Sequence, residues 1–319
     1  MSFDVVTVGV ICADVMAKPV DGLPPRGTLG LVPQLEMHLG GLAGVTAAVV
    51  CQLGGSAAFV GSLGQDGFGD YLLATLAKSG VDTRYVRRSG DANSSATVVL
   101  IAGDGERTFL HHMGTNATVT EADLDYEAIR QAKVFHWGGP GITPKLEGEA
   151  MGEIMKKVRA MGVQTSMDTC YDGTGRWYPL IAAALPHLDI VFSSLEEARG
   201  YTGKQTPEEI AAFYASHGVG TVVIKLGQGG LYLLRGDESF YLAAHEVKVV
   251  DTTGAGDASC GGFLYGHTRG WDLRRCGRLA NAVGGLTVQR MGGAEAVVSL
   301  EETLKFMDAA GTYASAGAV

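Results

Sequence analysis

A glycine-rich segment late in the chain places threonines and carboxylates where an anion can be held. It reads Asp-Thr-Thr-Gly-Ala-Gly-Asp over residues 251–257 and follows the apolar run Val247–Val250. We expect that run to form a strand and a helix to begin at about Asp257. Backbone N–H groups at a helix start lack intrahelical partners and face the positive end of the helix dipole. Because Gly254 and Gly256 carry no side-chain bulk, the turn can wrap an anion closely.

The last residue of that segment, Asp257, is the candidate general base. It stands beside the anion cradle, placed to accept a proton from a nucleophile that attacks the anion. An anion hole with an adjacent carboxylate is what phosphoryl transfer from a nucleotide to an alcohol requires. The motif alone fits equally well an ordinary strand-to-helix turn with an acidic cap, because glycine-rich turns of that kind are common.

Two familiar nucleotide-binding motifs are absent from the sequence. No stretch matches G-x-x-x-x-G-K-[ST], which excludes a P-loop enzyme. The late turn also fails G-x-G-x-x-G, because Ser259 occupies the third glycine position. A Rossmann-type dehydrogenase is therefore the least favoured alternative.

The elements that must position these residues alternate between strands and helices. A β-branched run over residues 4–10 predicts a buried strand, and a helix over 40–54 follows a Pro/Gly-rich stretch. A strand over 57–61 and a helix over 69–79 come next. This order, with short connections, predicts parallel pairing and right-handed crossovers. The later predicted elements are strands over 134–137, 163–167, 189–192, 221–226 and 230–234, a helix near 147–161, and mainly helix from 257 onward.

One segment breaks this alternation. Residues 96–101 and 107–111 flank Gly103-Asp104-Gly105, which is a strong hairpin signal. We expect an antiparallel hairpin attached as a flap to a mostly parallel sheet. A homodimer through this flap is predicted, because its apolar residues would gain by pairing with a second copy. These residues include Val99, Ile101, Phe109 and Leu110.

Composition excludes several classes of protein. The 319 residues are 46% hydrophobic and 18% charged, which are proportions of a globular chain. The net charge of −9 argues against a nucleic-acid partner, since phosphate neutralisation needs clustered positive charge. Without a long uninterrupted apolar run, we expect no membrane span.

The expected compartment is the cytoplasm. The start of the chain, Met1–Val6, has no basic region followed by a long apolar stretch, so we expect no signal peptide. The five cysteines are odd in number and never form a C-x-x-C pair. That usage favours reduced thiols over disulfides or a zinc site.

Two motifs together carry a family resemblance. Residues 251–257 closely resemble the C-terminal motif of the ribokinase-like carbohydrate kinases, also called the PfkB family. The family's N-terminal motif is matched by Gly40 and Gly41, which open a small-residue helix, and by the glycine loop over residues 61–69. The resemblance implies an α/β fold: a three-layer α/β/α ribokinase-like domain with a mostly parallel central sheet and a small β-sheet lid.

The resemblance covers nearly the whole chain. It implies that residues 1–319 form a single ribokinase-like kinase domain, with lid segments around residues 14–38 and 95–113. It also implies an activity, which is ATP-dependent phosphorylation of a hydroxyl group on a small sugar with the help of Mg²⁺. In this activity Asp257 would take the hydroxyl proton. The anion hole for the transferred phosphoryl group would comprise Gly254, Ala255, Gly256 and the Asp257 amide.

Four residues are implied as sugar contacts. Asp14, placed at the end of the first predicted strand, matches the family's acid that hydrogen-bonds sugar hydroxyls. Gly40 and Gly41 would bring backbone N–H groups against the sugar. The family usually offers an asparagine where this chain has Val45, and Thr46 is the candidate replacement.

The resemblance assigns further residues to the nucleotide and its cations. The implied nucleotide-binding residues are Ser194, Glu197, Lys225, Gly227, Gly229, Gly230 and Asn281. Ser194 departs from the family, which has an asparagine there. Glu197 would also help to place Mg²⁺, through water or phosphate. Asp251 and Thr253 match positions that bind a monovalent cation such as K⁺ in some members.

One departure from the family bears on the substrate class. Kinases of keto-acid sugars in the family carry a basic residue in the segment after strand 163–167, where this chain has Asp172. That difference favours a neutral polyhydroxy compound. Two alternatives stay open: a nucleoside kinase of the adenosine type on the same fold, and a non-catalytic relative that binds sugar or nucleotide.

Overall fold

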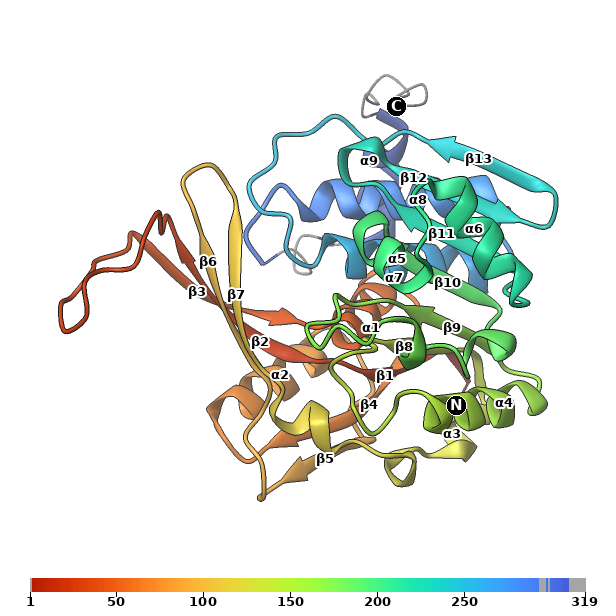
Figure 1. Cartoon of the computed structure of the whole chain (residues 1–319), viewed down its shortest axis with the longest axis horizontal. Coiled ribbons are helices and arrows are strands. Elements are labelled where there is room, and N and C mark those ends of the chain that lie inside the picture. Colours follow the sequence, from red (N-terminus) through yellow and green to blue (C-terminus); the bar gives the residue numbers. More distant parts are fainter. Residues whose placement is uncertain (1, 293–296, 298, 310–319) are drawn as a thin grey trace.

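Two sheets organise the chain in the computed structural model, which describes residues 2–292, 297 and 299–309 (Figure 1). Within these residues the larger sheet has nine strands and the smaller has four. The outermost parts of the predicted domain, residue 1 and residues 310–319, lie outside the described residues.

The larger sheet is parallel except at one edge. From that edge its strands are β13 (Glu238–Leu242), β12 (Leu231–Arg235), β11 (Thr221–Lys225), β10 (Ile190–Ser194), β9 (Gln164–Asp168), β8 (Ala132–Gly138), β1 (Phe3–Gly9), β4 (Ala57–Gly64) and β5 (Val86–Ser89). Only the pairs β11–β12 and β12–β13 are antiparallel among them. The predicted adjacency of strands 221–226 and 230–234 is thereby confirmed, and the parallel strands end together at one edge of the sheet.

Helices cover both faces of this sheet (Figure 1). One side carries α1 (Leu42–Gln52), α2 (Gly67–Lys78), α7 (Ala255–Thr268), α8 (Leu273–Thr287) and α9 (Leu300–Ala309), and the other carries α3 (Tyr126–Arg130), α4 (Glu149–Ala160), α5 (Leu195–Thr202) and α6 (Pro207–Ser216). β1 shows how the layers form, because Val5 enters one core while Val6 and Val8 enter the other. The predicted three-layer fold is confirmed. Among the described residues, no helix combines the length and apolar character that crossing a membrane needs.

The smaller sheet corrects the predicted flap. Its strand order is β3 (Gln34–Gly40), β2 (Cys12–Lys18), β6 (Ala96–Ile101) and β7 (Arg107–His112). The predicted hairpin is present as β6 and β7, but it belongs to this separate sheet and not to the larger one. Asp14 correspondingly lies in the middle of β2, not at the end of the first strand. We call this four-stranded sheet the lid.

One face of the lid carries a row of polar side chains. In the strand register, Asp14 lies opposite both His38 on β3 and Thr97 on β6, and Thr97 lies opposite His111 on β7. Because opposite residues in neighbouring strands share a face, these four side chains point the same way. Thr97 Oγ1 and His111 Nδ1 are 3.0 Å apart. We call these four residues the polar row.

The opposite face of the lid is apolar and exposed. Val15 lies opposite Met37 and Val98, and Val98 lies opposite Leu110. Leu110 is 61% exposed and Val98 is 41% exposed. This apolar row is therefore open to solvent over much of its surface.

Two residues predicted for a dimer surface are buried. Val99 and Ile101 are at most 1% exposed and pack with Met16 of β2, against which Met291 also rests. Alternation along β6 explains the error, because Val99 and Ile101 share the face of Thr97, which is turned toward the rest of the protein. Phe109 and Leu110 are exposed as predicted.

Candidate functional site

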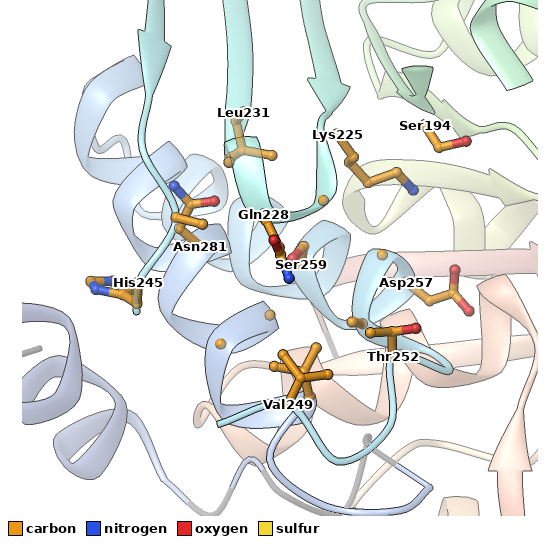
Figure 2. A pocket seen from close by; sticks show the side chains of 18 of the residues that line it. Ser194, Lys225, Gln228, Leu231, His245, Val249, Thr252, Asp257, Ser259 and Asn281 are labelled. Atoms are coloured by element: carbon orange, nitrogen blue, oxygen red, sulfur yellow. The ribbon is translucent and has the colours of Figure 1, made fainter. Parts of the chain in front are cut away.

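A cavity of about 570 Å³ lies at the edge where the parallel strands end, next to the start of α7. Its lining combines charged groups, Lys225, Glu197 and Asp257, with apolar side chains. Figure 2 shows Lys225, Ser194 and Asp257 on one side of it and Asn281 and His245 on the other. The apolar part of the lining includes Leu231, Val247, Val249 and Val288. A cavity that is charged at one end and apolar at the other suits a ligand with the same asymmetry.

The start of α7 provides the backbone groups of the charged end. Gly254 is the N-cap residue in the left-handed conformation, with φ at 72°, and the helix begins at Ala255. The helix therefore begins two residues earlier than predicted, and Asp257 lies in its first turn. In a first turn the N–H groups have no intrahelical carbonyl partner, so they can bind an anion. Ala255 N departs from the prediction because it donates to Thr252 O at 3.3 Å, which leaves the N–H groups of Gly256 and Asp257 as the candidates for the anion hole. Ala255, Gly256 and Asp257 all line the cavity.

The approach to this turn is not the predicted strand. Residues 246–250 form a loop in which Val247 and Val249 line the cavity. The apolar residues of this segment predict a strand. In the structure the side chains of Val247 and Val249 instead line the cavity, and residues 246–250 pair with no strand among the described residues. Sequence reasoning missed these two residues as site residues for that reason.

Asp257 sits among charged groups from four other elements. Its pKa is raised to about 7: burial is the largest cause, the carboxylates of Asp168, Glu197 and Asp14 also raise it, and Lys225 acts in the opposite direction. A carboxylate with a pKa near neutrality accepts a proton far more readily than an ordinary aspartate does. The surroundings therefore suit Asp257 to the work of a general base.

Lys225 is tied to an acid that the sequence analysis gave no role. Its Nζ lies 2.7 and 2.8 Å from the two carboxylate oxygens of Asp168, the last residue of β9. Burial by itself would lower the pKa of Lys225, but the Asp168 carboxylate raises it above its usual value. Lys225 is thus a fixed cation at the charged end of the cavity.

Glu197 and Ser194 form the start of α5. The Ser194 hydroxyl accepts a hydrogen bond from Glu197 N, and Glu197 Oε2 accepts one from Ser194 N at 3.2 Å, a reciprocal capping box. Thr169 Oγ1 donates to the same oxygen of Glu197 at 2.8 Å. Burial is the main factor that raises the pKa of Glu197. The serine in place of the family's asparagine therefore acts as a helix cap.

The side chains that could ligate a metal ion suit Mg²⁺ better than a metal ion held by protein ligands alone. Among the described residues there is no group of three or more His, Cys, Asp or Glu side chains that would hold a metal ion. Glu197 lines the cavity near its charged end, where its carboxylate offers a hard oxygen ligand. Mg²⁺ is commonly held in this way, by one or two carboxylates together with waters and nucleotide phosphates.

The remaining predicted nucleotide residues lie around the cavity. Gly227, Gly230 and Asn281 line it, whereas Gly229 is not among the described lining residues. The Asn281 Nδ2 group donates to Leu242 O and Ala243 O, so this amide shapes the wall of the cavity by holding the segment that follows β13.

Asp14 is buried on β2, and Gly40 of the neighbouring strand β3 leaves room for its carboxylate. A Cβ atom at Gly40 would stand 2.1 Å from Asp14 Oδ2, so only glycine lets this carboxylate lie against the backbone of β3. Cys12 Sγ donates to Asp14 Oδ1 at 3.2 Å. Burial raises the pKa of Asp14 to about 6. Gly41 follows as the N-cap of α1.

Thr46 has a different place from the one predicted. Its side chain is fully buried, and its hydroxyl donates to the backbone carbonyl of Asp257 at 3.1 Å. That bond joins α1 to the first turn of α7. Thr46 therefore helps to place Asp257, and its buried hydroxyl is not exposed to bind a sugar.

The segment of the proposed monovalent cation is in contact with the lid. Asp251 Oδ1 accepts hydrogen bonds from Thr253 N at 3.0 Å and Thr253 Oγ1 at 2.8 Å. Arg107 of β7 reaches across and donates to Thr253 Oγ1 at 3.2 Å. Arg107 also lines the cavity, and sequence reasoning missed it because no local motif links the hairpin to residues 251–257.

Asp172 does not act as the sequence analysis supposed. It is 2% exposed, and its oxygens accept hydrogen bonds from Thr174 N at 2.8 Å and Trp177 N at 2.6 Å. The carboxylate closes its own turn and does not face a bound substrate. Exclusion of an acidic substrate therefore cannot rest on Asp172.

Comparison with known proteins agrees with this geometry. The pfkB family of carbohydrate kinases matches residues 2–299. An aminoimidazole riboside kinase from Salmonella typhimurium is 31% identical over 286 residues, covering 85% of this chain and 89% of that protein.

Solved structures show the same fold. A ribokinase from Arabidopsis thaliana, solved with ribose and ATP, has a TM-score of 0.82 at 26% identity, covering 96% of this chain and 99% of that one. A putative ribokinase II from E. coli, solved with ATP and Mg²⁺, has a TM-score of 0.82 at 25% identity with the same coverage. The chain belongs to the pfkB family of carbohydrate kinases, and it is an ATP-dependent sugar kinase.

Proposed function

We propose that this protein transfers the γ-phosphoryl group of ATP to a hydroxyl group of a small neutral sugar. The observation that carries the proposal is the position of Asp257, in the first turn of α7 and in the wall of the cavity. The helix start and Lys225 supply positive character on the nucleotide side, while the Asp14 carboxylate of the lid is near enough to raise the pKa of Asp257.

The shape of the cavity supports one orientation of ATP. The adenine ring fits the apolar end, near Leu231, Val249 and Val288, and the phosphates extend toward α7 and Lys225. Backbone N–H groups of Gly256 and Asp257 then stabilise the charge on the transferred phosphoryl group. Mg²⁺, placed with the help of Glu197, neutralises phosphate charge when it is bound.

Asp257 accounts for the proton. The sugar hydroxyl oxygen forms a bond to the γ-phosphorus, the bond from that phosphorus to the β–γ bridging oxygen breaks, and ADP leaves. The hydroxyl proton passes to the Asp257 carboxylate. A raised pKa favours that transfer, and positioning by the helix start supplies much of the remaining rate enhancement.

The proposal of a neutral substrate rests on the negative charges near Asp257. Asp14 is placed to accept hydrogen bonds from sugar hydroxyls, and the nearby carboxylates of Asp257 and Glu197 disfavour a second anion beside the phosphates. A neutral polyhydroxy compound meets both conditions.

A nucleoside-type substrate is the second candidate. The observation in its favour is the 31% identity to an aminoimidazole riboside kinase, whose name gives a riboside as its substrate. Such a substrate keeps the hydroxyl contacts with Asp14 and adds an aromatic ring for the lid side.

A substrate panel with ATP and Mg²⁺ tests the function. Ribose, fructose, adenosine and aminoimidazole riboside are compared by ADP release, with 2-keto-3-deoxygluconate as the acidic control. We expect ADP release with a neutral compound and little with the acidic one. Tight sugar binding in calorimetry without ADP release from any compound would favour a non-catalytic binding protein instead.

A homodimer through the lid remains part of the proposal. Its support is the exposed apolar row, which a second copy would cover. We expect the paired changes Val98→Lys and Leu110→Lys to halve the mass measured by sedimentation equilibrium. An unchanged mass in this variant would contradict a dimer of this kind.

Two smaller parts of the function stay predictions. A monovalent cation at Asp251 and Thr253 predicts higher activity in KCl than in choline chloride at the same ionic strength. The Arg107 guanidinium already lies against Thr253, which argues for a small effect. The cytoplasmic location rests on the sequence alone.

A further inference from the structure

A buried ion pair lies directly behind the start of α7. Asp168 is fully buried at the end of β9, and Lys225 ends β11, so the lysine side chain crosses the end of β10 to reach it. Cys260, on α7, donates its S–H to Asp168 Oδ2 at 3.1 Å. Both carboxylate oxygens are therefore engaged, and the pair is joined to three elements of the site.

The ammonium is held against the turn that would bind phosphate. A Cβ atom at Gly256 would lie 3.1 Å from Lys225 Nζ and 3.6 Å from its Cδ and Cε atoms. The lysine stem therefore runs along the first turn of α7 at contact distance. Lys225 keeps 13% of its side chain exposed and lines the cavity, whereas Asp168 has no exposed surface.

We propose that Asp168 is a positioning residue for phosphoryl transfer: it holds the Lys225 ammonium beside the first turn of α7, where that ammonium contacts the transferred phosphoryl group of ATP. This inference rests on the proposed function. A lysine on a flexible four-carbon stem otherwise loses much rotamer freedom when it binds a phosphate. The bidentate contact with a buried carboxylate removes that freedom before ATP arrives.

The pair also sets the field around Asp257. The charged groups that face Asp257 are Asp168 on β9, Lys225 on β11, Glu197 on α5 and Asp14 on β2. Loss of the Asp168 charge removes one group that raises the pKa of Asp257, and it leaves the Lys225 charge, which lowers it, uncompensated. Both changes move the pKa of Asp257 downward. A purely structural role for Asp168 would not shift it in this way.

A double-mutant cycle tests the positioning role. Asp168→Asn, Lys225→Met and the double variant are titrated by calorimetry with the Mg²⁺ complex of AMP-PNP and, separately, with AMP. We expect each single change to weaken AMP-PNP binding about tenfold to a hundredfold, the scale of one charged hydrogen bond, and to leave AMP binding within about twofold. The double variant should bind AMP-PNP no more weakly than Lys225→Met alone.

A matched carboxylate serves as the control. Asp189 precedes β10 at the opposite end of the sheet, where its Oδ2 accepts a hydrogen bond from Thr165 N at 2.9 Å. Asp189→Asn should leave AMP-PNP binding unchanged. Additive effects in the cycle, or equal weakening of AMP and AMP-PNP, would overturn the proposal.

Two further measurements keep the test decisive. If Asp168→Asn does not fold, the double variant replaces it, because that variant has no unpaired buried lysine. The double variant should then bind AMP-PNP with the same affinity as Lys225→Met. Weaker binding by the double variant would count against the proposal. With an active substrate, the acid limb of the kcat profile should move to lower pH in Asp168→Asn, and an unmoved limb would contradict it. Nucleotide titration needs no sugar. A wild-type protein that binds AMP-PNP but phosphorylates nothing would refute the proposed function, and the double-mutant cycle would still support or overturn the contact that Asp168 gives Lys225 with the γ-phosphate.

Discussion

The two halves of the candidate site are built on opposite principles. In the half formed by the larger sheet, charged groups are buried and held by one another, as in the contact of Lys225 with Asp168. In the lid half, the polar row lies on a single sheet whose other face is open to solvent. The first arrangement fixes reactive groups in place, whereas the second meets the rest of the protein through one face of the lid.

Among the residues that the structure describes, few side-chain bonds join the two halves. Lys18 Nζ donates to Val250 O at 2.8 Å, and Arg107 donates to Thr253 Oγ1 at 3.2 Å, while Met291 packs on the inner face of the lid. The Lys18 and Arg107 bonds fall on the segment that leads into α7, so they join the lid to the anion hole through residues 250–253. Another bond, from Tyr71 Oη of α2 to Met37 O of β3 at 2.7 Å, joins the lid at a different place. We expect changes in the sheet half to lower kcat and changes in the lid half to act mainly on sugar KM.

The largest effect should come from the sheet half. Asp257→Asn removes the proton acceptor and should lower kcat by about 10²–10⁴, the range of general acid–base catalysis. The side chain keeps its size, so ADP affinity by calorimetry should stay within about twofold. Asp308→Asn, on the exposed end of α9, is the matched control and should have wild-type kcat. Wild-type turnover in Asp257→Asn would remove Asp257 from the role of base.

The pH dependence should separate the halves next. With burial raising its pKa to about 7, Asp257 becomes protonated as the pH falls through that value and can no longer accept the hydroxyl proton. We expect kcat to be level above about pH 8 and to fall about a hundredfold by pH 5, since each pH unit below the pKa costs tenfold. Turnover at saturating sugar and ATP measures this limb. A level kcat down to pH 5 would show that Asp257 titrates at an ordinary value.

Sequence patterns predicted the parts of the site that depend on local structure. The turn and the helix start at residues 251–257 depend only on short-range geometry, so the glycine motif in that segment predicts them. The Asp168–Lys225 contact was missed because these residues end strands that become neighbours only when β9, β10 and β11 align. No spacing in the sequence encodes that order. The strand Gln34–Gly40 was missed although Leu35, Met37 and Leu39 alternate with polar residues, which is a usable strand signal.

Substrate recognition in the lid half should be the third effect in size. Asp14→Ala removes a buried acceptor for sugar hydroxyls and should raise sugar KM about tenfold to a hundredfold, with a smaller change in kcat. The KM for ATP should stay near the wild-type value, because Asp14 does not line the cavity among the described residues. Asp104→Asn, in the turn of the hairpin, is the control within the same sheet. An equal rise in both KM values would mean that the halves do not divide the work.

The smallest effect should come from the bonds that hold the lid closed. Arg107→Ala removes the contact with Thr253 and a positive charge at the cavity wall, and we expect sugar KM to rise severalfold, up to about tenfold. A lid that stays open admits water, so ADP release without sugar should rise relative to ADP release with sugar. That ratio is the informative measurement, because lost phosphate binding alone would lower both rates together. Arg84→Ala, which breaks an exposed ion pair with Asp82, should leave the ratio unchanged. An unchanged ratio in Arg107→Ala would mean that closure of the lid does not depend on this contact, and that the polar row is held over the site by the packing of Met291 and the Lys18 bond instead.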